Sequence, residues 1–413
     1  MTGAGKALDI AICGAGPAGL ATALYMHRLG HRPVILERFD APRPLGSGLI
    51  LQPTGQAVLH DLGLFEAICA LGAPLDRLHG ADARSGRVVL DVRYHSLPGI
   101  GRGLGIHRAA LFGVLHDAVL EAGISIRTGQ SVQALADLPA GRRAVLFEGD
   151  QQSEPFDLVI DCLGGGSPLK PHSSGPGKAR ALPFGAIWGT VPWQGDGFEP
   201  TALTQRYQRA SVMIGVLPIG RAVPEGPELA AFFWSLKPAD YEALRQKGFA
   251  AWKEAVLGHW PEVRPHLDAV EDFSAMTLAR YAHHTMAMPV GEALAFVGDS
   301  AHSASPQLGQ GANMALLDAR ALHLALRDHP DDLDKALAHY ARLRRGHVRL
   351  YQALSAMFTP FYQSDSRMLP MVRDLFVSAL AKIPPAPQLL AAIVAGALLS
   401  PIKKLELEKP PGF

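Results

Sequence analysis

The stretch ALAFVGDSAHSASPQLGQGANMALLDARAL, residues 293–322, is the part of this sequence that decides the fold. Its five apolar residues Ala293 to Val297 are enough for one buried strand, and Gly298-Asp299 then ends the strand with a carboxylate. Ligands bind beside the carboxyl ends of strands in open α/β sheets. We therefore expect Asp299 to accept hydrogen bonds from the hydroxyls of a sugar or ribityl chain.

The second half of the stretch predicts a glycine-rich approach to a helix. Gly309-Gln310-Gly311 precedes Ala312 to Leu326, which has the composition of a long helix. Glycines let a flat ligand come close to backbone amides, and the amino end of the helix stabilises negative charge, as on a reduced flavin. The predicted contacts at this end are Asp299, Gly309, Gly311, Ala312 and Asn313.

A second phosphate-binding pattern opens the chain. Asp9 to Cys13 predicts a buried strand, Gly14-Ala15-Gly16-Pro17-Ala18-Gly19 is a GxGxxG loop, Leu20 to Leu29 a helix, and Pro33 to Leu36 a strand that ends in Glu37. In this context the loop binds a dinucleotide diphosphate and the acid holds ribose hydroxyls. The motif does not separate NAD from FAD, but its N-terminal position together with the Asp299 stretch favours FAD. The predicted contacts are Gly14, Gly16, Pro17, Ala18, Gly19, Glu37 and Arg38.

These motifs carry a resemblance to a known family. The stretch from Gly298 resembles the second flavin motif of the class A flavoprotein monooxygenases, the p-hydroxybenzoate hydroxylase-like family that includes the ubiquinone-biosynthesis hydroxylases. The resemblance implies that Gly48 lies against the flavin ring and that Arg108 reaches the flavin diphosphate or ribityl chain, although a plain turn and a surface arginine are the alternatives. The matching residues are Asp299, His302, Pro306, Gly309, Gln310, Gly311, Asn313 and Asp318.

The resemblance also implies a reaction. Reduced FAD would add O2 to form a C4a-hydroperoxyflavin, which would hydroxylate or epoxidise an aromatic, polyketide or other small hydrophobic substrate, with NADH or NADPH as reductant. The flavin supplies the oxygen chemistry, so no acid or base is required of the protein, and His302 and Pro306 are the near-flavin candidates for a catalytic role. The rival interpretations are a flavin-dependent halogenase or isoprenoid reductase, and a non-catalytic FAD-binding protein.

One position departs from the family pattern. After the apolar run Phe156 to Cys162 the family carries Asp-Gly, followed by a Ser and an Arg, whereas here Leu163 stands at the Asp position, Ser167 is kept and Lys170 replaces Arg. Leucine cannot accept hydrogen bonds from a cofactor. The departure predicts weak docking of nicotinamide and slow reduction by NAD(P)H, or electrons from a partner reductase.

Composition limits the remaining possibilities. The 413 residues are 48% hydrophobic and 19% charged with a net charge of +1, which fits a globular chain and disfavours nucleic acid as a partner. Cys13, Cys69 and Cys162 lie far apart, so they predict no metal site but buried, reduced thiols of a cytoplasmic protein. The adjacent pair His283-His284 points to opposite sides of a strand, which also disfavours metal binding. No signal peptide or membrane-spanning run occurs.

The expected fold is α/β, or α+β overall. A glutathione-reductase-type Rossmann domain for FAD would comprise residues 1–75, 100–178 and 285–350. A mostly antiparallel substrate-binding sheet would comprise residues 76–99 and 179–284, and C-terminal helices would fill 351–413. Pro238 to Trp260 has helical periodicity, and a long helix is expected over Asp331 to Leu354 with Arg342, Arg344 and Arg345 on a solvated face. The aromatic residues Trp188, Phe232, Phe233 and Trp234 either line a substrate pocket or form plain core.

The C-terminal segment is unusually apolar. Met368 to Ile383 and Leu389 to Leu399 predict helices that pack on the catalytic domain or on a second subunit. The alternative is peripheral contact with the inner face of a membrane, with Lys403 and Lys404 at the lipid headgroups.

Overall fold

The computed structural model describes residues 6–41, 47–149, 151–374 and 383–411. Its first layer is a six-stranded sheet in which β1 is central and every neighbour but the edge strand β19 is parallel. Because the strands are parallel, β1, β2, β11 and β20 end at the same edge of the sheet. In spatial order the strands are β19 (Val290–Gly291), β20 (Leu294–Phe296), β11 (Leu158–Asp161), β1 (Asp9–Cys13), β2 (Arg32–Leu36) and β8 (Ser125–Arg127).

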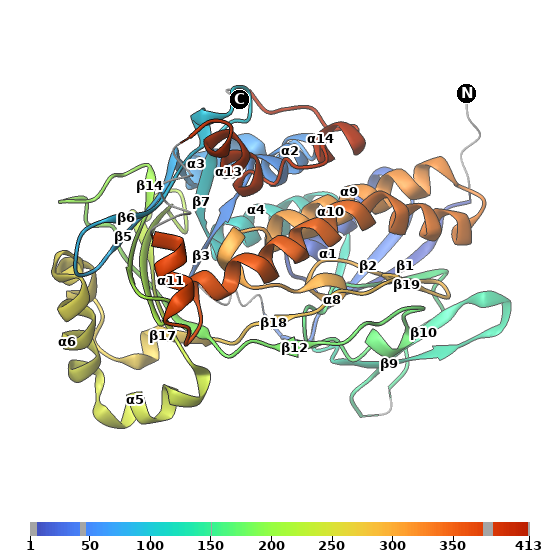
Figure 1. Ribbon diagram of the computed structural model, residues 1–413. Coiled ribbons are helices and arrows are strands. Elements are labelled where there is room, and N and C mark those ends of the chain that lie inside the picture. The colour runs from blue at the N-terminus through green and yellow to red at the C-terminus, as the bar shows by residue number, and fades with distance from the viewer. Residues whose placement is uncertain (1–5, 42–46, 150, 375–382, 412–413) are drawn as a thin grey trace.

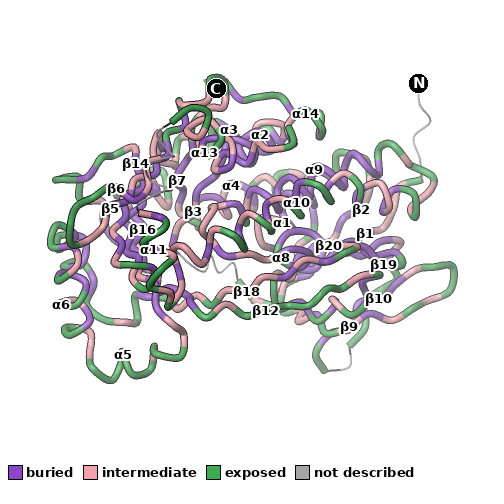
Figure 2. The backbone as a smooth tube through the Cα atoms, viewed as in Figure 1, coloured by how far each residue is buried: buried purple, intermediate pink, exposed green. Residues whose placement is uncertain are grey.

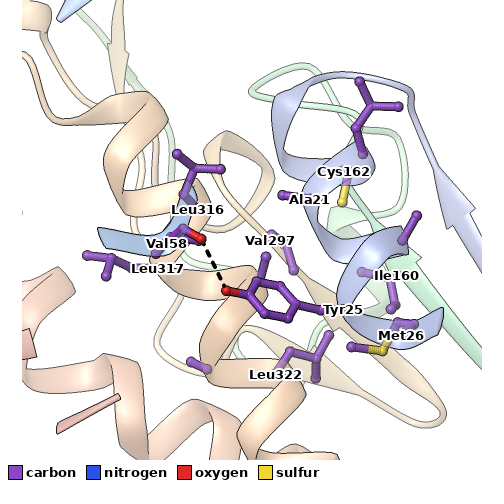
Figure 3. Close-up of a cluster of buried hydrophobic side chains, with 14 of the residues drawn as sticks. Ala21, Tyr25, Met26, Val58, Ile160, Cys162, Val297, Leu316, Leu317 and Leu322 are labelled. Atoms are coloured by element: carbon purple, nitrogen blue, oxygen red, sulfur yellow. Dashed lines mark hydrogen bonds between the residues drawn. The ribbon is translucent and has the colours of Figure 1, made fainter. Parts of the chain in front are cut away.

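Helices cover one face of this sheet. The helix α1 (Pro17–Arg28) packs against α9 (Gly311–Asp328), and the long helix α10 (Leu333–Tyr362) lies along α9 (Figure 1). The close-up in Figure 3 shows Tyr25 of α1 among Leu316, Leu317 and Leu322 of α9, all fully buried. Burial of these side chains is the main favourable term that holds the two helices on the sheet. The further helices of this domain are α2 (Pro53–Asp61), α3 (Phe65–Leu71) and α4 (Arg108–Glu121).

A seven-stranded, mostly antiparallel sheet forms the core of the second domain. Its only parallel pair among the described strands is β14 with β5. The sheet therefore combines a hairpin from the first quarter of the chain with strands from its middle. In order the strands are β17 (Met276–Ala279), β13 (Gly185–Pro192), β16 (Leu229–Leu236), β15 (Val212–Gly220), β14 (Ala202–Gln208), β5 (Arg77–Asp82) and β6 (Val88–Arg93).

The two faces of the seven-stranded sheet have different neighbours. On the outer face Phe232 and Trp234 pack with Trp252 of α6 (Phe249–His259), while Trp188 and Phe233 lie on the inner face with Met213. Figure 2 shows α5 (Tyr241–Lys247) as an exposed helix beyond this face, and α7 (Arg264–Asp268) completes the cover. The helical periodicity of Pro238–Trp260 does not correspond to one continuous helix. Gly248, with φ of 90°, separates α5 from α6.

Smaller elements join the two sheets. A three-stranded sheet of β3 (Gly48–Leu51), β7 (Gly103–His107) and β4 (Ala73–Leu75) lies where the domains meet. The pair β12 (Arg180–Ala181) and β18 (Ala282–His283) carries the chain out to the second sheet and back. The hairpin of β9 (Val132–Asp137) and β10 (Arg143–Phe147) covers the other face of the first sheet.

The C-terminal segment packs on both domains, with α13 against β6 and residues Tyr94–Ser96, and α14 against α2. Its described helices are α11 (Met368–Val372), α13 (Ala386–Val394) and α14 (Pro401–Lys404). The helix α11 packs against the end of α10, and Figure 1 draws α13 and α14 in red near α3 and α2. Ala391, Ile393, Ala395, Leu405 and Leu407 are buried. Packing on the catalytic domain is therefore confirmed for the described residues, and the membrane-contact interpretation is not supported. Residues 375–382 of the expected helix Met368–Ile383 lie outside the described residues.

Candidate cofactor site

The GxGxxG loop forms the first end of the site. Gly14 has φ of 104°, and a Cβ there would lie 2.8 Å from the carbonyl oxygen of Cys162. A Cβ at Gly19 would lie 1.9 Å from the carbonyl oxygen of Gly14, so only glycine lets α1 sit this close to β1. A Cβ at Gly16, in contrast, would meet nothing within 4 Å. Gly16 thus offers open space ahead of α1, where the residues present fit a diphosphate.

Glu37 lies at the end of β2 and is tied to this loop. Its carboxylate accepts hydrogen bonds from the backbone N–H of Ala15 at 2.8 Å and of Phe39 at 3.1 Å. The acid is thereby fixed beside the loop, in the position that a ribose-binding carboxylate requires. Arg38 is exposed, with its guanidinium 4.6 Å from the centre of the Phe39 ring.

Asp299 forms the second end of the site. It follows Gly298, whose φ is 69°, and begins the short helix α8 (Asp299–His302). A Cβ at Gly311 would lie 4.0 Å from Oδ1 of Asp299, so the carboxylate stands at the amino end of α9. Its side chain is exposed to water, yet the surrounding protein desolvates it and raises its pKa, against the opposing charges of His302, Arg108 and Lys170. A side chain in such surroundings fits the wall of a deep ligand site.

Gly298 brings the two ends together. A Cβ there would lie 3.0 Å from Cβ of Ala315 in α9 and 3.5 Å from Cβ of Ala18 in α1. The turn after β20 is therefore wedged between the two helices that begin at the glycine loops. The amino ends of α1 and α9 consequently face the same sheet edge, and their dipoles add favourably toward one anionic ligand.

Asp318 holds this turn from behind, a role that the motif match did not predict. Its buried carboxylate accepts hydrogen bonds from the backbone N–H of Gly298 at 2.9 Å, from Nε2 of His302 at 2.6 Å and from Nε of Arg344 at 2.5 Å. Burial by itself would raise the pKa of Asp318, but the positive charges of His302 and Arg344 outweigh it and lower that pKa. Burial by itself would lower the pKa of His302, but the charge and hydrogen bond of Asp318 raise it. Arg344 is 2% exposed, so the expectation of a solvated arginine face is wrong at this residue.

His302 is consequently engaged inside the protein. Its side chain is 5% exposed and uses Nε2 on Asp318. Pro306, the other candidate, opens the short turn Pro306–Leu308, which is half-buried. The arrangement places His302 in the support of the turn and Pro306 on the segment that leads to α9.

The Asn313 side chain is also fully used within the protein. Its Oδ1 accepts a hydrogen bond from the backbone N–H of Gln52, and its amide donates to the carbonyl oxygens of Ile50 and Gly309. Asn313 therefore clamps the start of α9 to β3. The neighbouring Gly311 is exposed and Ala312 is half-buried. The backbone N–H groups at the start of the helix are therefore accessible to a ligand.

Gly48 is placed at the domain boundary. A Cβ there would lie 2.4 Å from a methyl carbon of Ile219 and 3.2 Å from Cβ of Ala231, both in the seven-stranded sheet. Close packing between β3 and that sheet therefore accounts for the glycine. Residues 42–46 before it lie outside the described residues.

The inner face of the seven-stranded sheet approaches the second end of the site. Gln307 Nε2 lies 4.0 Å from the Met213 sulfur, and Trp188 donates a hydrogen bond of 2.7 Å to the hydroxyl of Tyr281. Trp188 and Phe233 also contact each other, with ring centres 4.6 Å apart. Of the four aromatic residues considered from the sequence, these two face the cofactor side, and Phe232 and Trp234 face the helices, because adjacent strand residues alternate.

Comparison with known proteins identifies this arrangement. The family model described as "FAD binding domain" matches residues 7–349. The chain belongs to this family. Its relatives are class A FAD-dependent monooxygenases. One is 6-methylpretetramide 4-monooxygenase of Streptomyces rimosus, which is 28% identical over 95% of this chain and 93% of that protein. The FAD-dependent urate hydroxylase of Mycolicibacterium vanbaalenii is 26% identical over 82% of this chain and 84% of that protein.

Solved structures show the same fold. The complex of Klebsiella pneumoniae HpxO with FAD and uric acid has a TM-score of 0.79 at 20% identity, covering 95% of this chain and 98% of that one. The tetrameric form of 2-methyl-3-hydroxypyridine-5-carboxylic acid oxygenase has a TM-score of 0.77 at 20% identity, with coverage of 97% and 98%. As a class A monooxygenase the chain is an FAD-dependent oxidoreductase, and the expected family, fold and FAD cofactor are confirmed.

Proposed function

We propose that this monooxygenase hydroxylates a small aromatic or fused-ring substrate held between the inner face of the seven-stranded sheet and FAD. The observation that carries the proposal is the convergence of Asp299 and the α9 start on that face, through the contact of Gln307 with Met213. Names of relatives support an aromatic substrate, since they include a urate hydroxylase and a 3-hydroxybenzoate 6-hydroxylase.

The residues have distinct parts in this reaction. Gly14, Gly16 and the α1 start would hold the FAD diphosphate, Glu37 the ribose hydroxyls, and Asp299 with Arg108 the ribityl region. When bound, FAD supplies the activation of O2. The α9 start would stabilise negative charge on the ring, and Trp188, Phe233 and Met213 would orient the substrate and exclude water.

Hydrogen-bonding side chains flank the inner face, together with the buried guanidinium of Arg373, which lies 5.2 Å from the centre of the Tyr207 ring. Gln52, Tyr94, Gln205 and Tyr207 are buried there, and each hydroxyl donates to a glutamine carbonyl, Tyr94 to Gln52 at 2.6 Å and Tyr207 to Gln205 at 3.0 Å. Such groups are of the kind that can hydrogen-bond the carbonyl and hydroxyl groups of a phenol or quinone. A fused-ring phenolic compound of the polyketide type fits this chemistry.

The test couples flavin content to oxygen use. The purified protein is expected to be yellow, to release FAD on denaturation as judged by mass spectrometry, and to consume O2 with NADH or NADPH in step with a hydroxylated product. Fused-ring phenols are compared with benzoates of similar size. A flavinated protein that reoxidises slowly and forms no product with either class would instead favour the non-catalytic alternative.

The finer partner assignments are part of the same proposal. We take NADH or NADPH as the direct reductant and O2 as the co-substrate, as is usual for the family. We also propose the C-terminal segment as a surface for dimerisation, which is supported by the exposed apolar side chains of Met368, Met371 and Leu389, 74%, 59% and 52% exposed. No helix in the described ranges is long and apolar enough to cross a membrane.

A further inference from the structure

The loop Leu163–Lys170 lies between the two ends of the cofactor site. It leaves β11 beside the GxGxxG loop, because the N–H of Cys162 donates to the carbonyl of Cys13 at 2.9 Å and the Cys162 carbonyl touches the Cβ position of Gly14. Further along, a Cβ at Gly165 would lie 3.9 Å from Cβ of Ser303, close behind Asp299. The loop therefore contacts residues beside both ends of the site.

Asp161 fixes that path. Its carboxylate is fully buried at the end of β11 and accepts hydrogen bonds from the N–H of Leu163 at 2.9 Å and from the hydroxyl of Ser167. The Ser167 oxygen accepts in turn from the N–H of Leu169 at 3.0 Å. Lys170 then closes the loop by donating to the carbonyl of Gly165 at 2.5 Å. One carboxylate thus holds the beginning and the middle of the loop.

Leu163 itself serves a different purpose. Its side chain packs against the apolar cluster that contains Phe156, Val159 and Leu169. A carboxylate at this position would be placed in apolar surroundings two residues from Asp161, where like charges repel. The absence of an acid at residue 163 is therefore matched by an acid at residue 161.

We propose that Asp161 is a positioning residue for the cofactor, which holds the loop Leu163–Lys170 as a wall between the GxGxxG loop and Asp299. This inference rests on the proposed function in that FAD is the ligand. Lys170, which this loop carries, acts electrostatically on both Asp161 and Asp299. The loop therefore brings a cation to the ribityl end of the site without offering a carboxylate at residue 163.

A purely structural role predicts a different effect on folding. Burial raises the pKa of Asp161 to about 6, against the hydrogen bonds of Ser167 and Leu163, so its ionised form weakens the fold at neutral pH. Replacement by the neutral isostere is then expected to leave the melting temperature at pH 8 unchanged or higher. A loss of cofactor affinity in a fold that is no less stable separates positioning from structural support.

The test compares Asp161→Asn with Asp157→Asn, a control at the opposite end of the same strand, where the carboxylate accepts from the N–H of Asp9. The FAD dissociation constant of the full chain, measured by flavin fluorescence, is expected to rise about tenfold for Asp161→Asn and to stay unchanged in the control. Ser167→Ala is expected to behave like Asp161→Asn, and the double variant no worse than either single one, because both break the same link.

A third variant tests residue 163. Leu163→Asp is expected to bind FAD more weakly, because the new carboxylate would lie in the apolar cluster beside Asp161. For the same reason the variant is not expected to regain the nicotinamide docking that the family's Asp implies, so its reduction by NADH or NADPH in anaerobic stopped flow should be no faster than that of the wild type. Tighter FAD binding or faster reduction in this variant would overturn the inference, as would wild-type FAD affinity in Asp161→Asn. A wild-type chain that cannot bind FAD would overturn the proposed function as well, so the two failures are distinguishable.

Discussion

Asp318 is the single residue on which the turn after β20 depends most directly. Three donors from three elements converge on its carboxylate, and one of them is the backbone N–H of Gly298, the residue that lets the chain turn with φ of 69°. Asp299 can point outward because Asp318 satisfies the turn from inside. The buried acid Asp318 therefore holds the backbone, while the exposed acid Asp299 is the one that we propose to contact the ligand.

Replacement of Asp299 by Ala is expected to weaken FAD binding by about 10- to 100-fold, the loss of one or two charge-assisted hydrogen bonds. Fluorescence titration of the full chain with FAD measures this. Asp331→Ala, an exposed acid beyond the carboxyl end of α9, is the matched control and is expected to leave the affinity unchanged. Full retention of FAD by Asp299→Ala after dialysis would exclude the assigned role.

Asp161 gives the pH dependence of stability a definite sign. Its pKa in the folded chain, about 6, lies above the ordinary value of 3.8, so its stabilising contribution is present below pH 3.8 and is lost as the pH rises through 6. Asp161→Asn is therefore expected to raise the free energy of unfolding at pH 8 by at most roughly 3 kcal/mol, less the lost hydrogen bonds, and by less at pH 5. Urea unfolding with saturating FAD at both pH values checks this, once about 1.4 kcal/mol is added back at each pH for the tenfold weaker FAD binding of the variant. A gain independent of pH would contradict it.

The sequence predicted residues whose function depends on nearby neighbours. The glycines of both loops, Glu37 and Asp299 are recognisable because each follows a strand at a fixed spacing. Arg344 was not recognisable as an ion-pair partner, since its carboxylate lies 26 residues away on another helix and nothing local distinguishes Arg344 from Arg345. The role of the Asp161 carboxylate was not predicted for the same reason. Only the folded structure shows that it accepts hydrogen bonds from Leu163 and Ser167.

At the scale of elements, the turn at the end of α13 is held by side chains from α2 and α10 and from the residue that precedes α9. The carbonyl oxygens of Val394, Ala395 and Gly396 accept hydrogen bonds from Gln310 at 2.6 Å, Thr54 at 3.4 Å and His347 at 2.9 Å. Gln310 directly precedes α9, so the turn braces the start of the cofactor helix. The sequence predicted a packed apolar tail but could not predict this bracing, because backbone carbonyls carry no sequence signature.

Gly396→Ala is expected to destabilise the chain by about 1–3 kcal/mol. Gly396 has φ of 78°, and a Cβ there would lie 2.5 Å from Oγ1 of Thr54 and 2.9 Å from Oε1 of Gln310. Gly346→Ala is the control, since its Cβ would meet only Leu399 at 3.7 Å and helix interiors favour alanine by about 0.5–1 kcal/mol. Thermal melts of both variants measure the difference, and equal melting temperatures would refute the bracing.

At the scale of the whole molecule, the proposed cofactor site joins parts that are distant in the chain. Its first end comes from residues 9–38 and its second from residues 299–313, and the inner face of the other sheet closes the far side. The order of strands in both sheets followed from no local pattern, since β5 and β6 join strands more than 100 residues later. Under the proposed function, bound FAD would therefore link regions that are distant in the sequence.

FAD is accordingly expected to stabilise the entire chain against heat. At a free concentration 100 times the dissociation constant the gain is about 2.7 kcal/mol. ADP, which engages only the first end, is expected to bind more weakly and to raise the melting temperature less at the same concentration. Differential scanning fluorimetry with FAD, ADP and neither compares the three, and an equal shift with ADP would show that the second end contributes nothing.

The braced turn at Val394–Gly396 also predicts when during translation the chain can first bind FAD. Asp299 leaves the ribosome 285 residues after Gly14, and Val394 another 95 residues later, so the start of the cofactor helix lacks its brace until then. FAD capture is on this account a late step of biosynthesis, and the nascent GxGxxG domain spends most of translation without its ligand. Stalled nascent chains of graded length are expected to retain FAD only once residue 396 has emerged, and retention by chains that stop at residue 350 would refute this order.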